Sequence, residues 1–148
     1  DAVHAYGGLV FHDVISVRHA EKAAAAGVDG IIAVSAGAGG HAGNVNPFAL
    51  VQEIRQCFDK TILLAGCINH GHQIAAAQLM GADLAYIGTR FINTQESGAP
   101  DGHKQMIIDS QASDILHTAM VSGVPANFMR QSLVDTTAHE YLSDLVKA

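Results

Sequence analysis

Residues 30–43 read GIIAVSAGAGGHAG, a short apolar run followed directly by a loop dense in glycine. Such a run, bounded by turn residues, is typical of a strand buried in a parallel sheet. The glycine loop at residues 37–43 lets the backbone approach a ligand closely, and His41 within it can exchange protons near neutral pH. The stretch therefore predicts an α/β fold with a cofactor site that contains an acid or a base.

The first 92 residues contain four apolar strands, each of the first three followed by a helix. Serine, asparagine and proline stand where the helices are expected to begin, and glycine stands where they are expected to end. This alternation indicates a parallel sheet buried on both faces. We expect strands at residues 9–14, 30–34, 61–65 and 84–87, and helices from Ser16 to Gly27, from Asn46 and Pro47 onward, and from His72 to Met80 before Gly81.

An internal repeat supports this assignment. Residues 25–32 and residues 79–86 each read as a helix end, a glycine, an aspartate and an apolar strand. Self-similarity of this kind indicates that the same supersecondary unit is used twice. The two copies lie two strand–helix units apart.

The pattern changes after Phe91. Within the remainder we expect a helix at residues 103–110, a short strand at 115–121, and helices at 125–134 and 139–147. Residues 93–148 are therefore predicted to form an appended, mostly helical segment that packs on the sheet or covers the site.

Composition limits the class of partner. The formal charge is −6, and lysine and arginine do not cluster, which argues against nucleic acid and against an anionic membrane surface. No apolar run approaches the roughly 18 residues that a membrane-spanning helix needs. Cys57 and Cys67 alone provide no disulfide framework, so a cytoplasmic location is expected. A small molecule is the partner that fits best.

Three loops follow the second, third and fourth expected strands: residues 37–43, 66–71 and 88–91. Parallel α/β folds place their chemistry at this end of the strands, so we expect the loops to share one rim. Backbone N–H groups of the last two loops and the Thr89 hydroxyl could bind a phosphate without a lysine. The same glycines could equally serve only to make tight turns, although two such loops in succession favour phosphate.

Four histidine or cysteine features have ordinary alternatives. His41 is a candidate general acid or base, or a hydrogen-bond donor to a bound ring, but an arbitrary loop histidine is more often merely exposed. His70 and His72 have metal-ligand spacing, yet carboxylate ligands at matching strand ends are not evident, so no metal site is predicted. His12 and Asp13 either point into the rim or form a solvated strand end. Cys67 is interpreted as a small residue that offers its N–H group rather than as a nucleophile.

Six motifs occur in the same order as in a known family. They are FHDV at residues 11–14, GAGGHAG at 37–43, AGCI at 65–68, MGAD at 80–83, IGTRF at 87–91 and SGVPAN at 122–127. As a set they resemble the nitronate monooxygenase family, formerly called 2-nitropropane dioxygenase. The resemblance covers nearly the whole chain and implies an FMN-dependent TIM barrel with an added smaller domain.

The resemblance also implies roles for individual residues. His41 would be the active-site histidine near the flavin. Many members have glycine or alanine at the position of Cys67; a backbone N–H contact survives that change unless the site demands positive φ. Some members have lysine at the position of Asp13 and glutamine at that of Val34, so contacts from those side chains are not carried over. The positions expected to contact FMN are Gly39, Gly66, Cys67, Gly88 and Thr89.

A complete (β/α)8 barrel takes about 250 residues and eight strands. The four expected strands match its C-terminal half, so residues 1–92 are predicted to be a half-barrel with the FMN phosphate site and the catalytic histidine. Such a half would need the missing N-terminal half-barrel or self-association to cover its open edges and face.

The implied activity is the FMN-dependent oxidation of alkyl nitronates or nitroalkanes by dioxygen, which yields a carbonyl compound and nitrite. Relatives of the family include enoyl reductases and quinone reductases, so an FMN-dependent NAD(P)H reductase of quinones or enoyl thioesters is the alternative within flavoenzymes. The alternative of another class is an inactive, self-associating half-barrel fragment.

Overall fold

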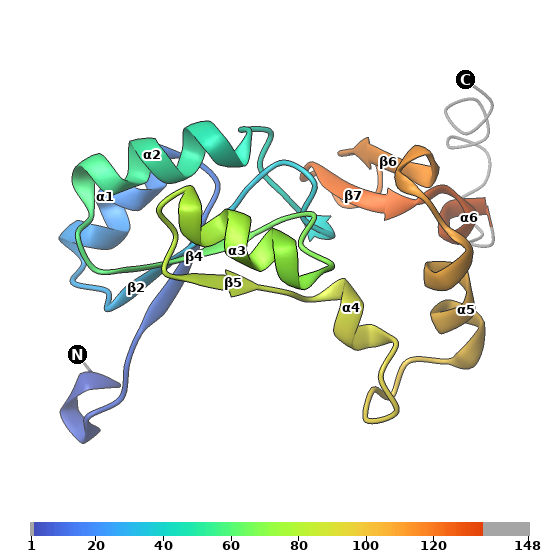
Figure 1. Cartoon of the computed structure of the whole chain (residues 1–148), viewed down its shortest axis with the longest axis horizontal. Helices are drawn as coiled ribbons and strands as arrows, with labels where there is room; N and C mark the ends of the chain where they lie inside the picture. Colours follow the sequence, from blue (N-terminus) through green and yellow to red (C-terminus); the bar gives the residue numbers. More distant parts are fainter. Residues whose placement is uncertain (1, 135–148) are drawn as a thin grey trace. The chain divides into compact units, whose positions relative to one another are not determined.

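A computed structural model describes residues 2–134 of the chain, which fold into two compact units (Figure 1). The first unit comprises residues 2–38 and 42–87. The second comprises residues 39–41 and 88–134. Among the described residues, no helix has the length and apolar character needed to cross a membrane.

The first unit is built on a parallel sheet with the strand order β1-β2-β4-β5. The register pairs Ile31 of β2 with His12 of β1 on one side and with Ile62 of β4 on the other. Helices connect successive strands, as expected, and a 3-10 turn, η1 (His4–Tyr6), precedes them. The elements are β1 (Phe11–Val14), α1 (Val17–Ala25), β2 (Gly30–Val34), α2 (Pro47–Cys57), β4 (Thr61–Ala65), α3 (Gly71–Leu79) and β5 (Leu84–Tyr86).

The helix ends of the first unit follow the local sequence. The side chains of Ser16 and Asn46 each accept a hydrogen bond from a backbone N–H in the first turn of the following helix, and Pro47 occupies the first turn of α2. After α1 and α3 the chain turns at Gly27 and Gly81, with φ of +83° and +102°. Glycine tolerates this conformation without strain, which is why both helices stop there.

The core of the first unit lies between the sheet and its helices. Successive strand residues point to opposite faces, and the alternate positions Ile31, Ile62 and Leu64 are at most 1% exposed against the helices. On the opposite face, Leu84 and Tyr86 are both 52% exposed. The helices of this unit therefore cover one face of its sheet. The buried core side chains are Val14, Ala20, Ala23, Val28, Ile31, Ala33, Leu50, Val51, Ile54, Phe58, Ile62, Leu64, Ile68, Ala77 and Ala82.

The two aspartates of the internal repeat make the same junction twice. The Asp29 N–H donates to Val10 O at 2.8 Å, and its Oδ2 accepts from the Val10 N–H at 2.7 Å. Asp83 repeats both bonds with Ile62, each at 2.8 Å. Each aspartate thus connects the start of one strand to the start of the neighbouring strand by two hydrogen bonds. The two copies of the repeated sequence therefore have the same structural role.

The second unit contains an antiparallel sheet that was not expected. Its strand order is β3-β7-β6, so residues of the glycine loop pair with a strand far along the chain. The described elements are β3 (Gly40–His41), α4 (Thr89–Ile92), α5 (Asp101–Asp109), η2 (Ala112–Asp114), β6 (Ile115–Thr118), β7 (Ala126–Met129) and α6 (Arg130–Val134).

The expected helix at residues 125–134 is therefore wrong in its first half. Residues 126–129 form β7, which pairs with β3 on one side and β6 on the other, and only Arg130–Val134 is helical. A short apolar run is ambiguous between helix and strand, and here long-range pairing decides. The helix at residues 103–110 is confirmed as α5, and the first part of the strand at 115–121 is confirmed as β6.

Residues 88–91 and 139–147 are the two remaining segments with a predicted structure. The stretch at residues 88–91, expected to be a loop, enters α4 at Thr89. The helix expected at residues 139–147 lies outside the described residues.

Candidate functional site

In the first unit, the turns after β2 and β4 contact each other. The Ser35 N–H and hydroxyl both donate to Ala65 O, at 3.0 and 2.8 Å, and Ser35 is fully buried. The Cys67 thiol donates to Gly37 O at 3.5 Å. These bonds hold the Gly66 turn against the start of the glycine loop, because β2 and β4 are adjacent parallel strands that end at the same edge.

The backbone of the Gly66 turn is unusual. Gly66 has a φ of +131°, and Cys67, at +54°, is the one residue other than glycine with positive φ in the described part of the chain. A left-handed conformation costs a residue with a side chain about 1–2 kcal/mol. Because position 67 has a positive φ, glycine and cysteine are not equivalent there: cysteine is strained in this conformation and glycine would not be.

The N–H groups of this turn are available to a ligand. Within residues 2–134, neither the Gly66 N–H nor the Cys67 N–H donates a hydrogen bond. Adjacent backbone donors without protein partners at the end of a parallel strand are suited to an anion such as a phosphate. The expectation that Cys67 contributes its N–H group rather than a nucleophilic sulfur is compatible with this geometry.

In the second unit, two expected cofactor-contacting residues lie against each other. A Cβ atom added to Gly39 would lie 2.8 Å from Thr89 Oγ1, closer than a real Cβ contact allows. Gly88 precedes Thr89 as the N-cap of α4. The N–H groups of Gly88 and Thr89 and the Thr89 hydroxyl make no hydrogen bond to any described residue. The absence of a side chain at Gly39 thus leaves the hydroxyl of Thr89 in reach of a ligand.

His41 is held by the antiparallel sheet. Its backbone pairs with Ala126 in β7, which fixes where the side chain starts. The imidazole Nε2 lies 3.2 Å from Ser122 Oγ, and the ring is exposed. The Ser122 hydroxyl in turn donates to Val124 O at 3.2 Å. Ser122 was not among the expected site residues, although it begins the SGVPAN motif.

The other histidine features, His70 with His72 and His12 with Asp13, are each formed by neighbouring residues. The rings of His70 and His72 stack with centroids 5.4 Å apart and an interplanar angle of 15°. Across residues 2–134, no three side chains of histidine, cysteine, aspartate or glutamate gather closely enough to hold a metal ion. His12 and Asp13 are successive residues of β1, so they point to opposite faces of the sheet and do not act as a pair.

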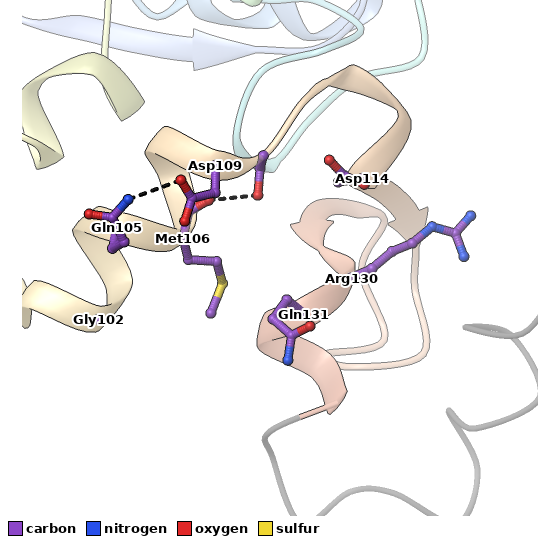
Figure 2. Close-up of a pocket in the computed structure, with 8 residues that line it drawn as sticks. Gly102, Gln105, Met106, Asp109, Asp114, Arg130 and Gln131 are labelled. Atoms are coloured by element: carbon purple, nitrogen blue, oxygen red, sulfur yellow. Dashed lines mark hydrogen bonds between the residues drawn. The ribbon is translucent and has the colours of Figure 1, made fainter.

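A separate pocket of about 570 Å³ lies in the second unit, and Figure 2 shows it. It contains the Gln105–Asp109 hydrogen bond of 2.9 Å. Its walls come from α5, η2 and α6 and include none of the expected site residues. The lining residues are Gly102, Gln105, Met106, Asp109, Ser110, Asp114, Arg130 and Gln131.

A sequence model of the nitronate monooxygenase family matches residues 1–144. The chain belongs to this family. In structure it is similar to a nitroalkane oxidase from Streptomyces ansochromogenes, with 33% identity and a TM-score of 0.79 over 85% of this chain and 40% of that one. It is also similar to FabK from Thermotoga maritima, with 28% identity and a TM-score of 0.81 over 98% of this chain and 49% of that one.

A curated relative in Rhodococcus jostii is a dehydrogenase of a hydroxylated octahydroindene carboxyl-CoA, 32% identical over 91% of this chain. The chain covers only 38% of the length of that dehydrogenase, and 40% of the nitroalkane oxidase. The fold expectation is confirmed, because the four-stranded parallel sheet corresponds to the C-terminal half of a TIM barrel.

Proposed function

We propose that the protein carrying this chain oxidises alkyl nitronates or nitroalkanes with FMN and dioxygen, producing a carbonyl compound and nitrite. The observation that carries the proposal is the placement of His41, whose imidazole is bonded to Ser122 and whose strand continues directly from Gly39 beside Thr89. Family membership and the likeness to a nitroalkane oxidase support it.

Each unit, taken by itself, offers residues that fit the phosphate group of a cofactor. Gly66 and Cys67 in the first unit, and Gly88 and Thr89 in the second, offer backbone donors that no described residue uses. Gly39 has no Cβ atom, and a Cβ atom at this position would displace the Thr89 hydroxyl. When bound, FMN would supply the electron-accepting isoalloxazine ring, and these five residues would contribute binding and orientation.

His41 would act on the α-proton of a neutral nitroalkane, or donate a hydrogen bond to the nitro oxygens. An exposed imidazole with one nitrogen bonded to a hydroxyl retains a second nitrogen for substrate. A positioned general base contributes roughly 10²- to 10⁴-fold in rate. A nitronate has already lost the α-proton, so His41 is expected to matter much more for nitroalkanes than for nitronates.

The experiment uses the protein expressed from its whole gene. The purified protein is expected to show the visible absorption of bound FMN, or to acquire it on reconstitution. A colourless protein that takes up no FMN would contradict the proposal. The His41→Asn variant is expected to lose turnover of neutral nitroalkane while keeping FMN and nitronate turnover, and unchanged nitroalkane turnover would exclude the base role.

A second candidate is an FMN-dependent NAD(P)H reductase of quinones or enoyl thioesters. The likeness to a dehydrogenase whose name specifies a CoA ester favours it. Rapid flavin reduction by NADH or NADPH without oxygen, together with little nitrite formation from nitronates, would make this the better assignment.

We also propose a partner for the open sheet face of the first unit, where Leu84 and Tyr86 are exposed. Either an N-terminal half-barrel of the same protein or a second copy of this chain would cover it. Gel filtration of the 148-residue chain with added FMN distinguishes the outcomes. Self-association without FMN binding would indicate an inactive half-barrel, whereas a monomer that binds FMN tightly would exclude that alternative.

A further inference from the structure

We propose that Ser122 is a positioning residue that keeps the proton of neutral His41 on Nε2, so that Nδ1 is the nitrogen that accepts the substrate proton. This inference rests on the proposed function for its substrate. Its structural part concerns only the imidazole and its hydrogen bonds.

The hydrogen bonds of Ser122 have a defined direction. A serine hydroxyl has one proton, and the Ser122 hydroxyl donates it to Val124 O at 3.2 Å. Toward His41 Nε2, also 3.2 Å away, the Ser122 oxygen therefore acts as the acceptor. A neutral imidazole carries one N–H, and a hydrogen bond made by one ring nitrogen decides which of the two nitrogens holds that hydrogen. Nε2 thus holds the hydrogen and Nδ1 is left with its lone pair.

Nδ1 remains accessible. Among residues 2–134, no hydrogen bond reaches this nitrogen. The other histidine of this sheet, His117, pairs with Asn127 and bonds to its side-chain oxygen at 2.9 Å. His41 pairs with the preceding residue, Ala126, so the register places His117 and His41 on opposite faces of the sheet. His117 therefore does not compete for the imidazole of His41.

The turn between β6 and β7 holds Ser122 near the imidazole of His41. Ser122 lies between β6 and β7, and the chain reverses at Gly123, which has a φ of +77°. The Gly123 N–H donates to Ala119 O at 2.7 Å and closes the turn. β7 begins at Ala126, the residue that pairs with His41. The backbone of His41 and the partner of its side chain thus belong to one sheet, and the ring is held at two points.

The first arm of the test reads the tautomer directly, without turnover. Nitrogen-15 NMR of histidine-labelled protein, with the His41 signals assigned by their loss in His41→Asn, is expected to show a neutral ring protonated at Nε2. Ser122→Ala is expected to lose this preference, and Ser122→Thr is expected to keep it. A ring protonated at Nδ1, or a tautomer unaffected by Ser122→Ala, would overturn the proposal.

The second arm compares two substrates in the protein expressed from its whole gene. Ser122→Ala is expected to lower kcat/KM for a neutral nitroalkane by about 10- to 100-fold, the loss typical of removing the hydrogen-bond partner that orients a metal-ligating histidine. It should change nitronate turnover little, and Ser122→Thr should restore activity. A matched control is Ser110→Ala, which also removes a hydroxyl-to-carbonyl bond in the second unit, the 2.7 Å bond to Met106 O.

Equal losses on both substrates would show a merely structural role for Ser122 and would overturn the positioning role. If the wild-type protein turns over no nitroalkane, the proposed function fails, and the NMR arm alone decides the placement of the His41 proton. In the His41→Asn background, Ser122→Ala is expected to cause no additional loss, because the group that it positions is already absent.

Discussion

The parallel sheet of the first unit and the antiparallel sheet of the second are built from similarly short strands, but they bury very different amounts of side chain. The first unit contains the continuous apolar core, from Val14 to Ala82. In the described part of the second unit, the buried residues are Thr118, Ala126 and Leu133. Both units thus offer backbone donors, but the first provides the stable core, whereas the second provides the imidazole of His41 and the hydroxyls of Thr89 and Ser122. Substitutions in the two units should accordingly have different readouts.

The largest expected effect is on the core of the first unit. Leu64 is 1% exposed among the helices, so Leu64→Ala should reduce the free energy of unfolding by about 2–5 kcal/mol. Leu116, half-buried in β6 of the second unit, offers the matched control, and Leu116→Ala should cost clearly less. Urea denaturation followed by circular dichroism measures both. Equal losses would contradict the contrast between the units.

The next effect concerns cofactor binding rather than stability. In Gly39→Ala the new methyl group forces the Thr89 hydroxyl to rotate away, because the two would lie 2.8 Å apart. FMN affinity should fall by about ten- to hundredfold, the equivalent of one or two charge-assisted hydrogen bonds. Gly98→Ala, with no atom near the added Cβ, is the control. Fluorescence titration with FMN measures the affinity, and a Gly39→Ala variant with wild-type affinity would argue against the assigned phosphate contacts.

The next largest effect on stability is expected from the hydrogen bonds that Asp29 and Asp83 make between neighbouring strands. Asp83→Ala leaves the Ile62 N–H without its acceptor and should cost about 1–3 kcal/mol in the free energy of unfolding. Asp29→Ala should act in the same direction. The two aspartates differ in their second partner. Asp83 accepts a hydrogen bond of 2.8 Å from Arg55, whose guanidinium is always charged, whereas Asp29 bonds to His4, which is charged only when protonated. Thermal unfolding of the two variants tests the comparison.

The same junctions predict a loss of stability in acid. The Ile62 N–H, and then Arg55, lower the pKa of Asp83, and the Val10 N–H, and then His4, lower the pKa of Asp29. A carboxyl whose pKa is lower in the folded state stabilises the fold above its unfolded pKa, about 3.9, and this stabilisation is lost as the pH falls through the folded pKa. Unfolding at pH 2–6 should show less pH dependence in Asp83→Asn than in the wild type, and an unchanged pH dependence would be the contrary result.

The smallest expected effect is a gain in stability rather than a loss. Cys67→Gly relieves a positive φ of +54° and should raise the free energy of unfolding by up to about 1 kcal/mol, after the greater entropy of glycine in the unfolded chain is subtracted. Cys57→Gly is the matched control, since Cys57 lies in α2, where glycine is unfavourable, and it should destabilise. Destabilisation by Cys67→Gly would mean that the thiol contact with Gly37 outweighs the backbone strain.

Much of the first unit was predictable because its signals are local. Ser16, Asn46 and Pro47 mark where helices begin, and Gly27 and Gly81 mark where they stop. Each of these acts on the backbone within a few residues of itself. The internal repeat supported the assignment of helices and strands, whereas the hydrogen bonds of its aspartates to Val10 and Ile62 became visible only in the structure.

The second unit was less predictable because its strands depend on distant partners. Residues 126–129 have no strong preference of their own, and they form a strand because the glycine loop pairs with them on one side. Nothing local indicates that His41 meets Ser122, 81 residues further along the chain. The positive φ of Cys67 likewise requires the packed turn around it.

The sequence by itself therefore determined the α/β class, the four strands of the parallel sheet, and glycine-rich turns at their ends. Apolar periodicity and capping residues act over short distances and do not depend on the rest of the fold. Only the tertiary structure decided which side chains meet: Gly39 with Thr89, Cys67 with Gly37, and His41 with Ser122. Such contacts join residues far apart in the chain, and they form only once long-range strand pairing and core packing have offset the entropy of closing the intervening loops.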